Sequence, residues 1–299
     1  MTLFALGNKP MNYAWGSAAL LSDLLGIAEP DYPIAEQWFG THPTAPAQVL
    51  DAEGGTLTER FGELGYLVKF LAAANPLSIQ AHPSKAHAAR QFLNHHPSYS
   101  DANHKPELII AITDFRALCG FRPAADTQAD LDALAQAHES FVPLAEVFGL
   151  GGFQPAMQWI YESNPELILT LVAHASVLGR KRDRLIEQLF QLYGQDHGVL
   201  VSLLMNLVTL SPGEGLYLPA GNIHAYLEGL GVEVMASSDN VLRGGLTSKP
   251  VDVRELLRVL DYTELAEPKI AVKKLSKGIW DYPTKAEDFN VYRVEPSAS

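Results

Sequence analysis

The sequence predicts a mainly β protein with a helical insertion in its middle. Residues 1 to about 118 are rich in Gly, Pro, Trp and Tyr and contain short apolar runs bounded by turn residues, a texture typical of strands. From about residue 120 to 200, apolar residues recur at three- and four-residue spacing, which indicates helices. Strand texture returns at Val199 and continues through Val234. We therefore expect a discontinuous β domain built from residues 1–118 and 199–262, with an all-α subdomain of residues 119–198 inserted between its halves.

The individual elements follow in chain order. Residues 67–71 and 108–112 are strand-sized apolar runs, and between them residues 84–93 predict a helix that Ser84 can cap after Pro83. The insertion predicts helices at residues 130–137, 164–179 and 184–193. A short strand at 216–218 and an amphipathic helix at 251–260 come next, and residues 265–299 again alternate apolar and polar side chains.

Composition excludes several classes of protein. The 299 residues include 34 acidic and 22 basic side chains, a net charge of −12, which disfavours binding to nucleic acid or to anionic membrane surfaces. The single cysteine, Cys119, rules out an intramolecular disulfide and fits a reducing compartment. The start of the chain lacks a signal-peptide pattern, and the longest nearly apolar run, residues 199–210, falls short of the ~20 residues of a membrane helix. We expect a cytoplasmic protein, with the oligomeric state left open and a monomer preferred.

The strongest local pattern runs from Gly213 to His224. It reads as a turn at 211–214, a short strand, a second turn at 219–222 and then a histidine at the start of the returning strand. The spacing G-x5-P-x-G-x2-H resembles the second motif of cupin barrels. That resemblance implies a jelly-roll-like barrel whose mouth carries a metal site and a small ligand.

Two segments in the first half offer further metal ligands. Strand periodicity puts Ser78, Gln80 and His82 on one face, and Lys105 and Glu107 share parity just before the run at 108–112. A satisfied polar pair and an exposed loop are the structural alternatives for these two segments. A buried carboxylate and ammonium, however, are costly unless they meet a partner or a metal.

Together these residues define a candidate metal site. Two imidazoles with a carboxylate are a common catalytic zinc arrangement, although iron, manganese, cobalt or nickel would also be accepted. The candidate ligands are Gln80, His82, Glu107 and His224.

Several segments, in order, resemble the type I mannose-6-phosphate isomerases: residues 12–17, 35–43, 78–83, 104–107, 219–226 and 233–249. The resemblance implies a zinc-dependent interconversion of D-mannose 6-phosphate and D-fructose 6-phosphate through a cis-enediol, with one zinc ion per chain on the four candidate ligands. It covers the chain to about residue 262. The departures at Gln37, Gly244 and Ser248 touch no ligand. Longer relatives carry a second cupin barrel, so residues 263–299 are interpreted as a remnant or truncated start of one.

The resemblance places the family's active-site arginine on Arg243, which can stabilise an enediolate or hold a phosphate. A loop-surface arginine is the alternative. The catalytic base stays open among three residues: His104, Lys105 and Glu233. Glu233 also fits a structural ion pair with Arg243 or Lys249.

Substrate binding involves a further set of candidates. Lys249 is a candidate phosphate ligand, and the other residues would shape the sugar pocket, although packing is the alternative for each of them. The set is Lys249, Trp15, Glu36, Ser78, Tyr226 and Asp239.

Two other functions compete with the isomerase. A cupin oxidoreductase such as a dioxygenase would favour an H-x-H segment, whereas this chain has Gln80-Ala81-His82. A non-catalytic sugar-phosphate binder would need neither Arg243 nor Lys249 beside a complete ligand set. An isomerase acting on a small sugar phosphate is therefore the expectation.

Overall fold

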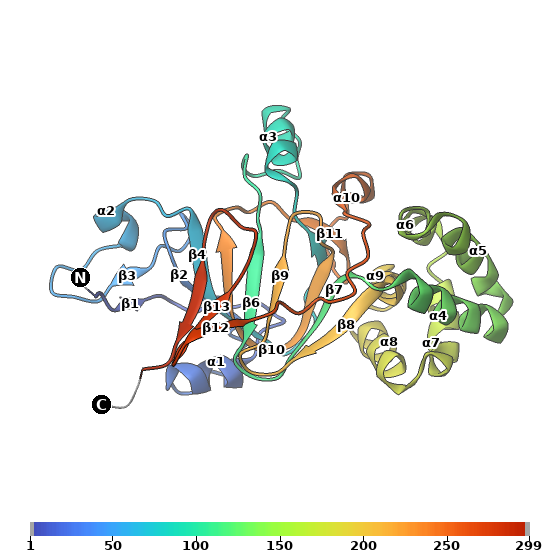
Figure 1. Cartoon of the computed structure of the whole chain (residues 1–299), viewed down its shortest axis with the longest axis horizontal. Coiled ribbons are helices and arrows are strands. Elements are labelled where there is room, and N and C mark those ends of the chain that lie inside the picture. Colours follow the sequence, from blue (N-terminus) through green and yellow to red (C-terminus); the bar gives the residue numbers. More distant parts are fainter. Residues whose placement is uncertain (1–2, 297–299) are drawn as a thin grey trace.

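A computed structural model describes residues 3–296, and its centre is a pair of antiparallel β-sheets with helices at one end (Figure 1). The strands are β1 (Leu6–Gly7), β2 (Glu36–Phe39), β3 (Gln48–Val49), β4 (Tyr66–Ala73), β5 (Ile79–Ala81), β6 (Glu107–Ala111), β7 (Phe115–Phe121), β8 (Met205–Leu210), β9 (Gly215–Leu218), β10 (His224–Ala236), β11 (Leu242–Gly245), β12 (Lys273–Ser276), β13 (Ile279–Tyr282) and β14 (Val291–Val294). The α-helices are α1 (Ala18–Leu25), α2 (Leu57–Phe61), α3 (Lys85–Leu93), α4 (Ala124–Ala137), α5 (Val142–Gly151), α6 (Phe153–Glu162), α7 (Leu167–His174), α8 (Arg180–Tyr193), α9 (Gly198–Val201) and α10 (Val253–Val259), with 3-10 turns η1 (Glu139–Phe141), η2 (Ala175–Leu178) and η3 (Ser202–Leu204).

Strand β10 belongs to both sheets and holds them together. Its first residues pair with β5 and β7, and its second half pairs with β4 and β6. The first sheet extends through β11 and β8, and the second through β2 and β9. This arrangement confirms the predicted jelly-roll-like β fold.

A bulge in β10 controls which side chains face the interior. The register shifts between Tyr226 and Glu228, and Gly229 follows with φ of +125°, a conformation that favours glycine. Side chains alternate faces along a strand, so an odd spacing would put Tyr226 and Glu233 on opposite faces. Because of the bulge both face inward, and the Tyr226 hydroxyl donates to Glu233 Oε1 at 2.6 Å.

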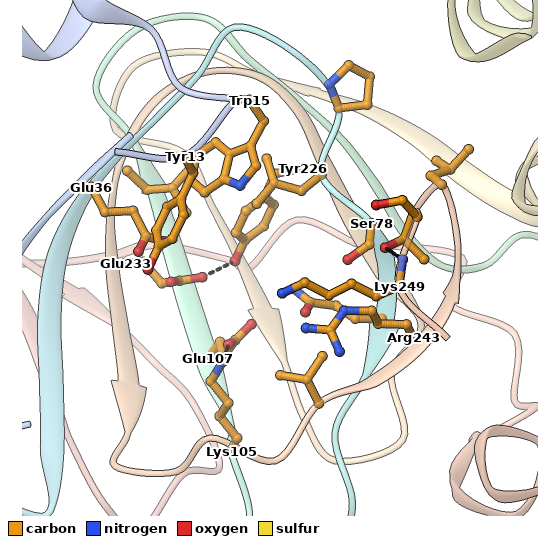
Figure 2. A pocket seen from close by; sticks show the side chains of 18 of the residues that line it. Tyr13, Trp15, Glu36, Ser78, Lys105, Glu107, Tyr226, Glu233, Arg243 and Lys249 are labelled. Atoms are coloured by element: carbon orange, nitrogen blue, oxygen red, sulfur yellow. Dashed lines mark hydrogen bonds and ion pairs between the residues drawn. The ribbon is translucent and has the colours of Figure 1, made fainter. Parts of the chain in front are cut away.

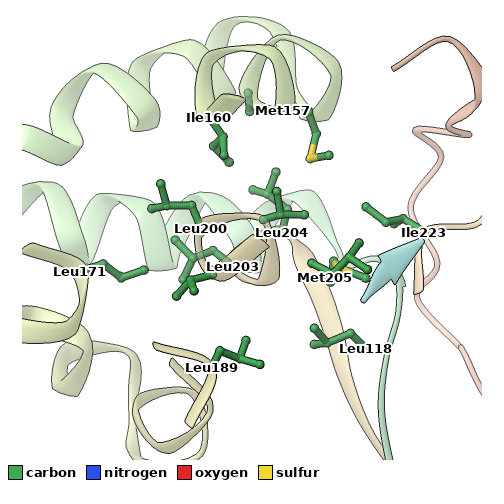
Figure 3. Packing of buried hydrophobic residues seen from close by; sticks show 14 of the residues in the cluster. Leu118, Met157, Ile160, Leu171, Leu189, Leu200, Leu203, Leu204, Met205 and Ile223 are labelled. Carbon is green, nitrogen blue, oxygen red and sulfur yellow. The ribbon is translucent and has the colours of Figure 1, made fainter. Parts of the chain in front are cut away.

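The helices of the insertion pack on the outer face of the first sheet. Residues from β5, β7 and β10 form one hydrophobic cluster with α4–α9, and Figure 3 shows Leu118 and Ile223 beside Met205 near Leu203 and Leu204. The sheet that carries the start of β10 is therefore supported from behind by the insertion.

The C-terminal strands β12, β13 and β14 form a separate three-stranded sheet. Tyr282 and Phe289 from this region pack with Leu108 and Val234 on the outer face of the second sheet. These strands cover that face and do not extend its edges. The interpretation of residues 263–299 as part of a second barrel stays a prediction, and residues 297–299 lie outside the described part of the chain.

Most predicted elements are present, with α3 capped by Ser84, whose hydroxyl accepts from His87 N. The prediction that strand begins at Val199 is wrong, because residues 198–204 form α9 and η3. This short apolar run is buried on every side, and such a run has no periodicity that separates a strand from a helix. The helices α1, α2, α5 and α6 were not predicted.

Candidate active site

Three buried side chains meet where their strands begin or end. His82 directly follows β5, Glu107 opens β6 and His224 opens β10. His82 Nε2 lies 3.4 Å from Glu107 Oε1, and His224 Nε2 lies 3.3 Å from Glu107 Oε2. One ligand atom from each of these residues lies within 4.8 Å of the others.

The orientation of both imidazoles suits a metal ion. His82 Nδ1 lies 2.7 Å from the carbonyl oxygen of Asn240, and His224 Nδ1 lies 3.1 Å from that of Asn222. Each Nδ1–H donates to a carbonyl, which directs the Nε2 lone pairs at Glu107. Both Nε2 atoms and Glu107 Oε2 are buried without a hydrogen-bond partner in the described structure. Such orphaned acceptors are rare, and a divalent cation would satisfy all three.

The protonation states of His82 and Glu107 also favour a metal site. Burial lowers the pKa of His82 to about 4, so its imidazole is neutral and available as a ligand at neutral pH. Burial alone would raise the pKa of Glu107, but the charge of Lys105 holds it well below its usual range. Lys105 Nζ lies 3.0 Å from Glu107 Oε1, as their shared parity predicts.

The fourth candidate ligand, Gln80, lies in register with His224 on one side and with Arg243 on the other. It lines the same cavity as Glu107. Adjacent strands with matched register put these side chains on a common face.

This cavity, of about 410 Å³, opens above the cluster. Figure 2 shows Arg243 and Lys249 on one side of it and Glu36 and Glu233 on the other. The predicted residues that line it are Trp15, Glu36, Ser78, Gln80, Lys105, Glu107, Tyr226, Glu233, Arg243 and Lys249.

A buried ion network forms the acidic side of the cavity, and Lys69 is its centre. Lys69 Nζ lies 3.1 Å from Glu36 Oε1 and 2.7 Å from Glu233 Oε2. Trp38 Nε1 donates to Glu36 Oε2 at 2.8 Å. The sequence offers Arg243 or Lys249 as the ion-pair partner of Glu233. In the structure the partner is Lys69 instead. The sequence signal for Lys69 was a lone lysine inside a strand-sized apolar run.

Burial changes the acidity of this network in a consistent way. It raises the pKa of Glu233, while the Lys69 ammonium opposes the rise. The two carboxylates more than offset the burial of Lys69 and raise its pKa. Tyr226, also buried, has its pKa raised far above its ordinary value.

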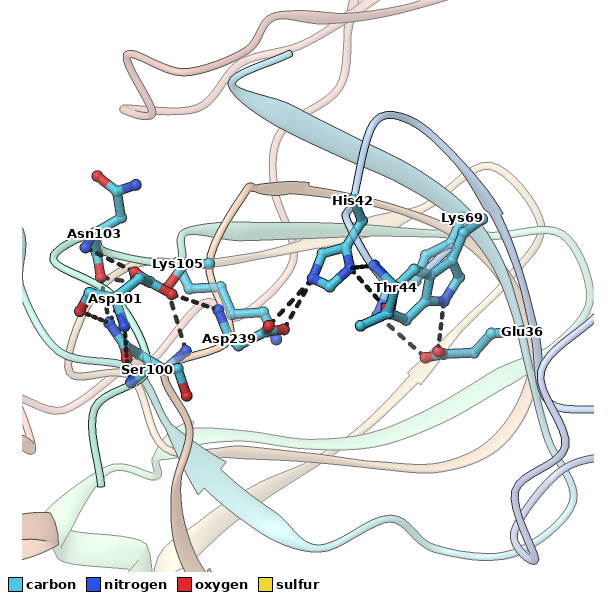
Figure 4. Close-up of polar contacts among 12 residues, drawn as sticks. Glu36, His42, Thr44, Lys69, Ser100, Asp101, Asn103, Lys105 and Asp239 are labelled. Atoms are coloured by element: carbon cyan, nitrogen blue, oxygen red, sulfur yellow. Dashed lines mark hydrogen bonds and ion pairs between the residues drawn. The ribbon is translucent and has the colours of Figure 1, made fainter. Parts of the chain in front are cut away.

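Two predicted residues lie elsewhere. His104 Nε2 lies 2.9 Å from Asp288 Oδ2 in the C-terminal region, and His104 is not among the residues that line the cavity. Asp239 Oδ1 lies 3.2 Å from His42 Nε2 (Figure 4), and Asp239 is not among the residues that line the cavity. His104 is adjacent to Lys105 in sequence, but neighbouring residues in extended chain point in opposite directions.

The fold and this cluster together define a class of protein. Two antiparallel sheets share a strand, and a buried His–Glu–His cluster lies where the strands meet. These features define a cupin-like protein with a candidate metal site and a helical subdomain.

Comparisons with known proteins identify the family. Residues 3–124 match the family described as phosphomannose isomerase type I, catalytic domain. Mannose-6-phosphate isomerase from Salmonella typhimurium is 36% identical over 94% of this chain and 81% of the relative, and that from Homo sapiens is 33% identical over 99% and 83%. The chain belongs to the type I mannose-6-phosphate isomerase family.

Solved structures agree with this assignment. A crystal structure of a phosphomannose isomerase variant from Salmonella typhimurium superimposes with a TM-score of 0.88 at 33% identity, over 96% of this chain and 82% of that one. A mannose 6-phosphate isomerase bound with zinc and yttrium gives a TM-score of 0.86 at 34% identity, also over 96% and 82%. No helix among residues 3–296 has the length and apolar character to cross a membrane.

Proposed function

We propose that this chain interconverts D-mannose 6-phosphate and D-fructose 6-phosphate with the help of one bound zinc ion. The observation that carries the proposal is the His82–Glu107–His224 cluster, which has three buried polar atoms without a hydrogen-bond partner and whose Glu107 lines the same cavity as Arg243 and Lys249. The names of the relatives and the zinc in one similar structure support it.

The metal-binding residues would be His82, Glu107 and His224, with Gln80 as the fourth ligand from the adjoining strand. The donor set of two neutral imidazoles, a carboxylate and an amide oxygen fits zinc. When bound, the ion would polarise the substrate's carbonyl and the neighbouring hydroxyl.

The cationic side of the cavity would bind the anionic parts of the substrate. Arg243 stands on β11 beside Gln80, so its guanidinium faces the same space as the metal ligands. Lys249 is exposed at the rim and reaches into the cavity from outside. We assign the phosphate to Lys249 and the developing enediolate oxygen to Arg243, since this division keeps the planar guanidinium near the reacting carbons.

The proton would move between C1 and C2 through a cis-enediol. Two of the three candidate bases, Lys105 and Glu233, line the cavity, whereas His104 faces Asp288. Glu233 is held by the Tyr226 hydroxyl, and its raised pKa brings it toward the range in which a general base works. Lys105 Nζ stands beside Glu107. We assign the proton transfer to Glu233 and Lys105.

The proposal also includes a monomer in the cytoplasm. The only cysteine, Cys119, is buried, and burial raises the pKa of its thiol to about 12, which leaves it unreactive.

Metal analysis of the purified protein should give one zinc per chain, and sedimentation should give the mass of a single chain.

A coupled assay tests the activity itself. Fructose 6-phosphate should form from mannose 6-phosphate, formation should stop with a chelator, and added zinc should restore it. Arg243→Ala should abolish turnover with unchanged zinc content. Absence of turnover by fully metallated protein would overturn the proposed function, and activity in Arg243→Ala would overturn the role of that residue.

The two candidate bases separate by their pH profiles. Glu233→Gln should remove the acidic limb of the profile of kcat/KM if Glu233 takes the proton, and Lys105→Met should remove the basic limb if Lys105 returns it. Profiles unchanged in shape in both variants would overturn the assignment.

A further inference from the structure

The helical subdomain reaches the cavity rim through the side chain of Asp196, which lies between α8 and α9. Asp196 Oδ1 accepts hydrogen bonds from the backbone N–H groups of Gly198 and Leu246, each at 2.7 Å. Asp196 Oδ2 accepts a longer bond, 3.4 Å, from Thr247 N. One carboxylate therefore satisfies two successive backbone donors of the segment that follows β11.

That segment, taken here with the last residue of β11 as residues 245–249, has a conformation that needs support. Leu246 has φ of +54°, in the left-handed region that a leucine rarely adopts, and its side chain is nonetheless buried. Gly245 has φ of +120°, and a Cβ there would lie 2.6 Å from both Asp196 Oδ1 and Gly198 N. A Cβ at Gly198 would in turn lie 2.7 Å from Leu246 N. The two backbones can approach this closely only because residues 198 and 245 are both glycine.

A further hydrogen bond ties Gly244, the residue just before this segment, to the subdomain. The hydroxyl of Tyr161, on α6, donates to the carbonyl of Gly244 at 2.8 Å. The segment is thus held by a donor from α6 on one side and an acceptor from the α8–α9 connection on the other.

The held segment carries part of the cavity lining. Leu246, Thr247, Ser248 and Lys249 all line the cavity, as does Arg243, which lies two residues before the segment. Lys249 N in turn donates to Thr247 Oγ1 at 3.1 Å, so the position of Lys249 depends on that of Thr247.

We propose that Asp196 is a positioning residue, which sets the conformation of residues 245–249 and thereby the binding of the substrate's phosphate. The proposal rests on the proposed function, in which Lys249 meets that phosphate. It gives the helical insertion a part in substrate binding besides covering a sheet. Asp196 itself is not a catalytic residue, because it acts through the backbone of the loop.

The test compares Asp196→Ala with a control variant, Glu146→Gln. Glu146 is an exposed residue of α5 that lines a separate hollow on the outside of the subdomain. KM and kcat for mannose 6-phosphate are measured, together with the Kd of inorganic phosphate by calorimetry, zinc content and far-UV circular dichroism. Loss of charge-assisted hydrogen bonds should raise KM and the phosphate Kd about tenfold or more. The kcat should stay within about threefold, since Lys105 and Glu233 lie outside β11, and Arg243 is held within β11 by its pairing with Gln80. Zinc content should be unchanged, and Glu146→Gln should match the wild type.

A double variant shows whether Asp196 acts through the loop. If it does, Asp196→Ala combined with Lys249→Ala should bind phosphate no more weakly than Lys249→Ala alone, because the two effects share one path. If Asp196→Ala does not fold, Asp196→Asn keeps one acceptor oxygen and should give the same KM effect at reduced size.

Several outcomes overturn the proposal. They are an unchanged KM and phosphate Kd in Asp196→Ala, a fall in kcat alone, a loss of zinc, or additive effects in the double variant. Calorimetry keeps this test separate from the proposed function. Wild-type protein that binds phosphate but does not isomerise mannose 6-phosphate would overturn the function and leave Asp196 testable.

Discussion

Replacing Lys69 by methionine removes the ammonium group that forms ion pairs with two buried carboxylates. Glu36 and Glu233 are 5% and 2% exposed, and their oxygens lie 3.1 Å and 2.7 Å from Lys69 Nζ. At an effective dielectric constant of about 20, the attraction at these separations is about 5–6 kcal/mol for each pair before desolvation is counted. Methionine is similar in length and apolar, so the change isolates the loss of charge.

The expected loss of stability is about 3–5 kcal/mol, because truncating one partner of a buried ion pair leaves the other charge uncompensated. This corresponds to a folding equilibrium constant lower by a factor of about 100 to several thousand. Urea-induced unfolding measures it, with fluorescence of the four tryptophans as the signal. Trp38 is a local reporter, since its indole donates to Glu36.

Two further variants make the result specific. Lys181→Met removes an exposed lysine at the start of α8 and should change the unfolding free energy by about 0.5 kcal/mol at most. Lys69→Met combined with Glu233→Gln should be more stable than Lys69→Met alone, because one of the orphaned charges is gone. A loss below about 1 kcal/mol in Lys69→Met would refute the account of the network as a compensated buried triad.

Three other expectations follow from local geometry. Gly229→Ala should cost about 3 kcal/mol in urea unfolding, since its Cβ would lie 2.6 Å from Asp114 O; a cost near zero would show that β10 does not need its bulge. Asn240→Ala should weaken zinc binding about tenfold in competition with a chelating dye, because the Asn240 side chain donates to the carbonyls of Asp101 and Asn103 and so fixes the backbone carbonyl that orients His82; equal affinity would contradict this. Glu255 is buried, which alone would raise its pKa, but neighbouring histidine and tyrosine side chains lower the pKa below 4.5. Its contribution to stability is therefore present above pH 4.5 and lost on further acidification, so Glu255→Gln should lose less thermal stability than wild type between pH 7 and pH 3; parallel losses would contradict the linkage.

The sequence by itself determined the chemical content of the site. His82, Glu107 and His224 came from strand parity and from one turn–strand–turn spacing, and the structure brings all three together. Strand periodicity is a local property, so parity within a short segment survives folding. The helix after Ser84 was predictable for the same reason, because a cap acts within one turn.

Only the tertiary structure decided which polar residues cooperate across elements. Glu233 faces Tyr226 because a bulge reverses the parity of β10, and Lys69 pairs with Glu233 because β4 lies beside β10. His104 was plausible from sequence, yet it turns toward Asp288, 184 residues away in the chain.

The residues 245–249 show the same division between local and long-range information. Gly244 and Gly245 mark an unusual backbone in the sequence, but nothing near them names the acceptor that stabilises it. That acceptor, Asp196, lies 50 residues from Leu246. Local sequence therefore determined the candidate ligands and their strands. Partners separated by long stretches of chain were decided by packing, which alone sets their distances and burial.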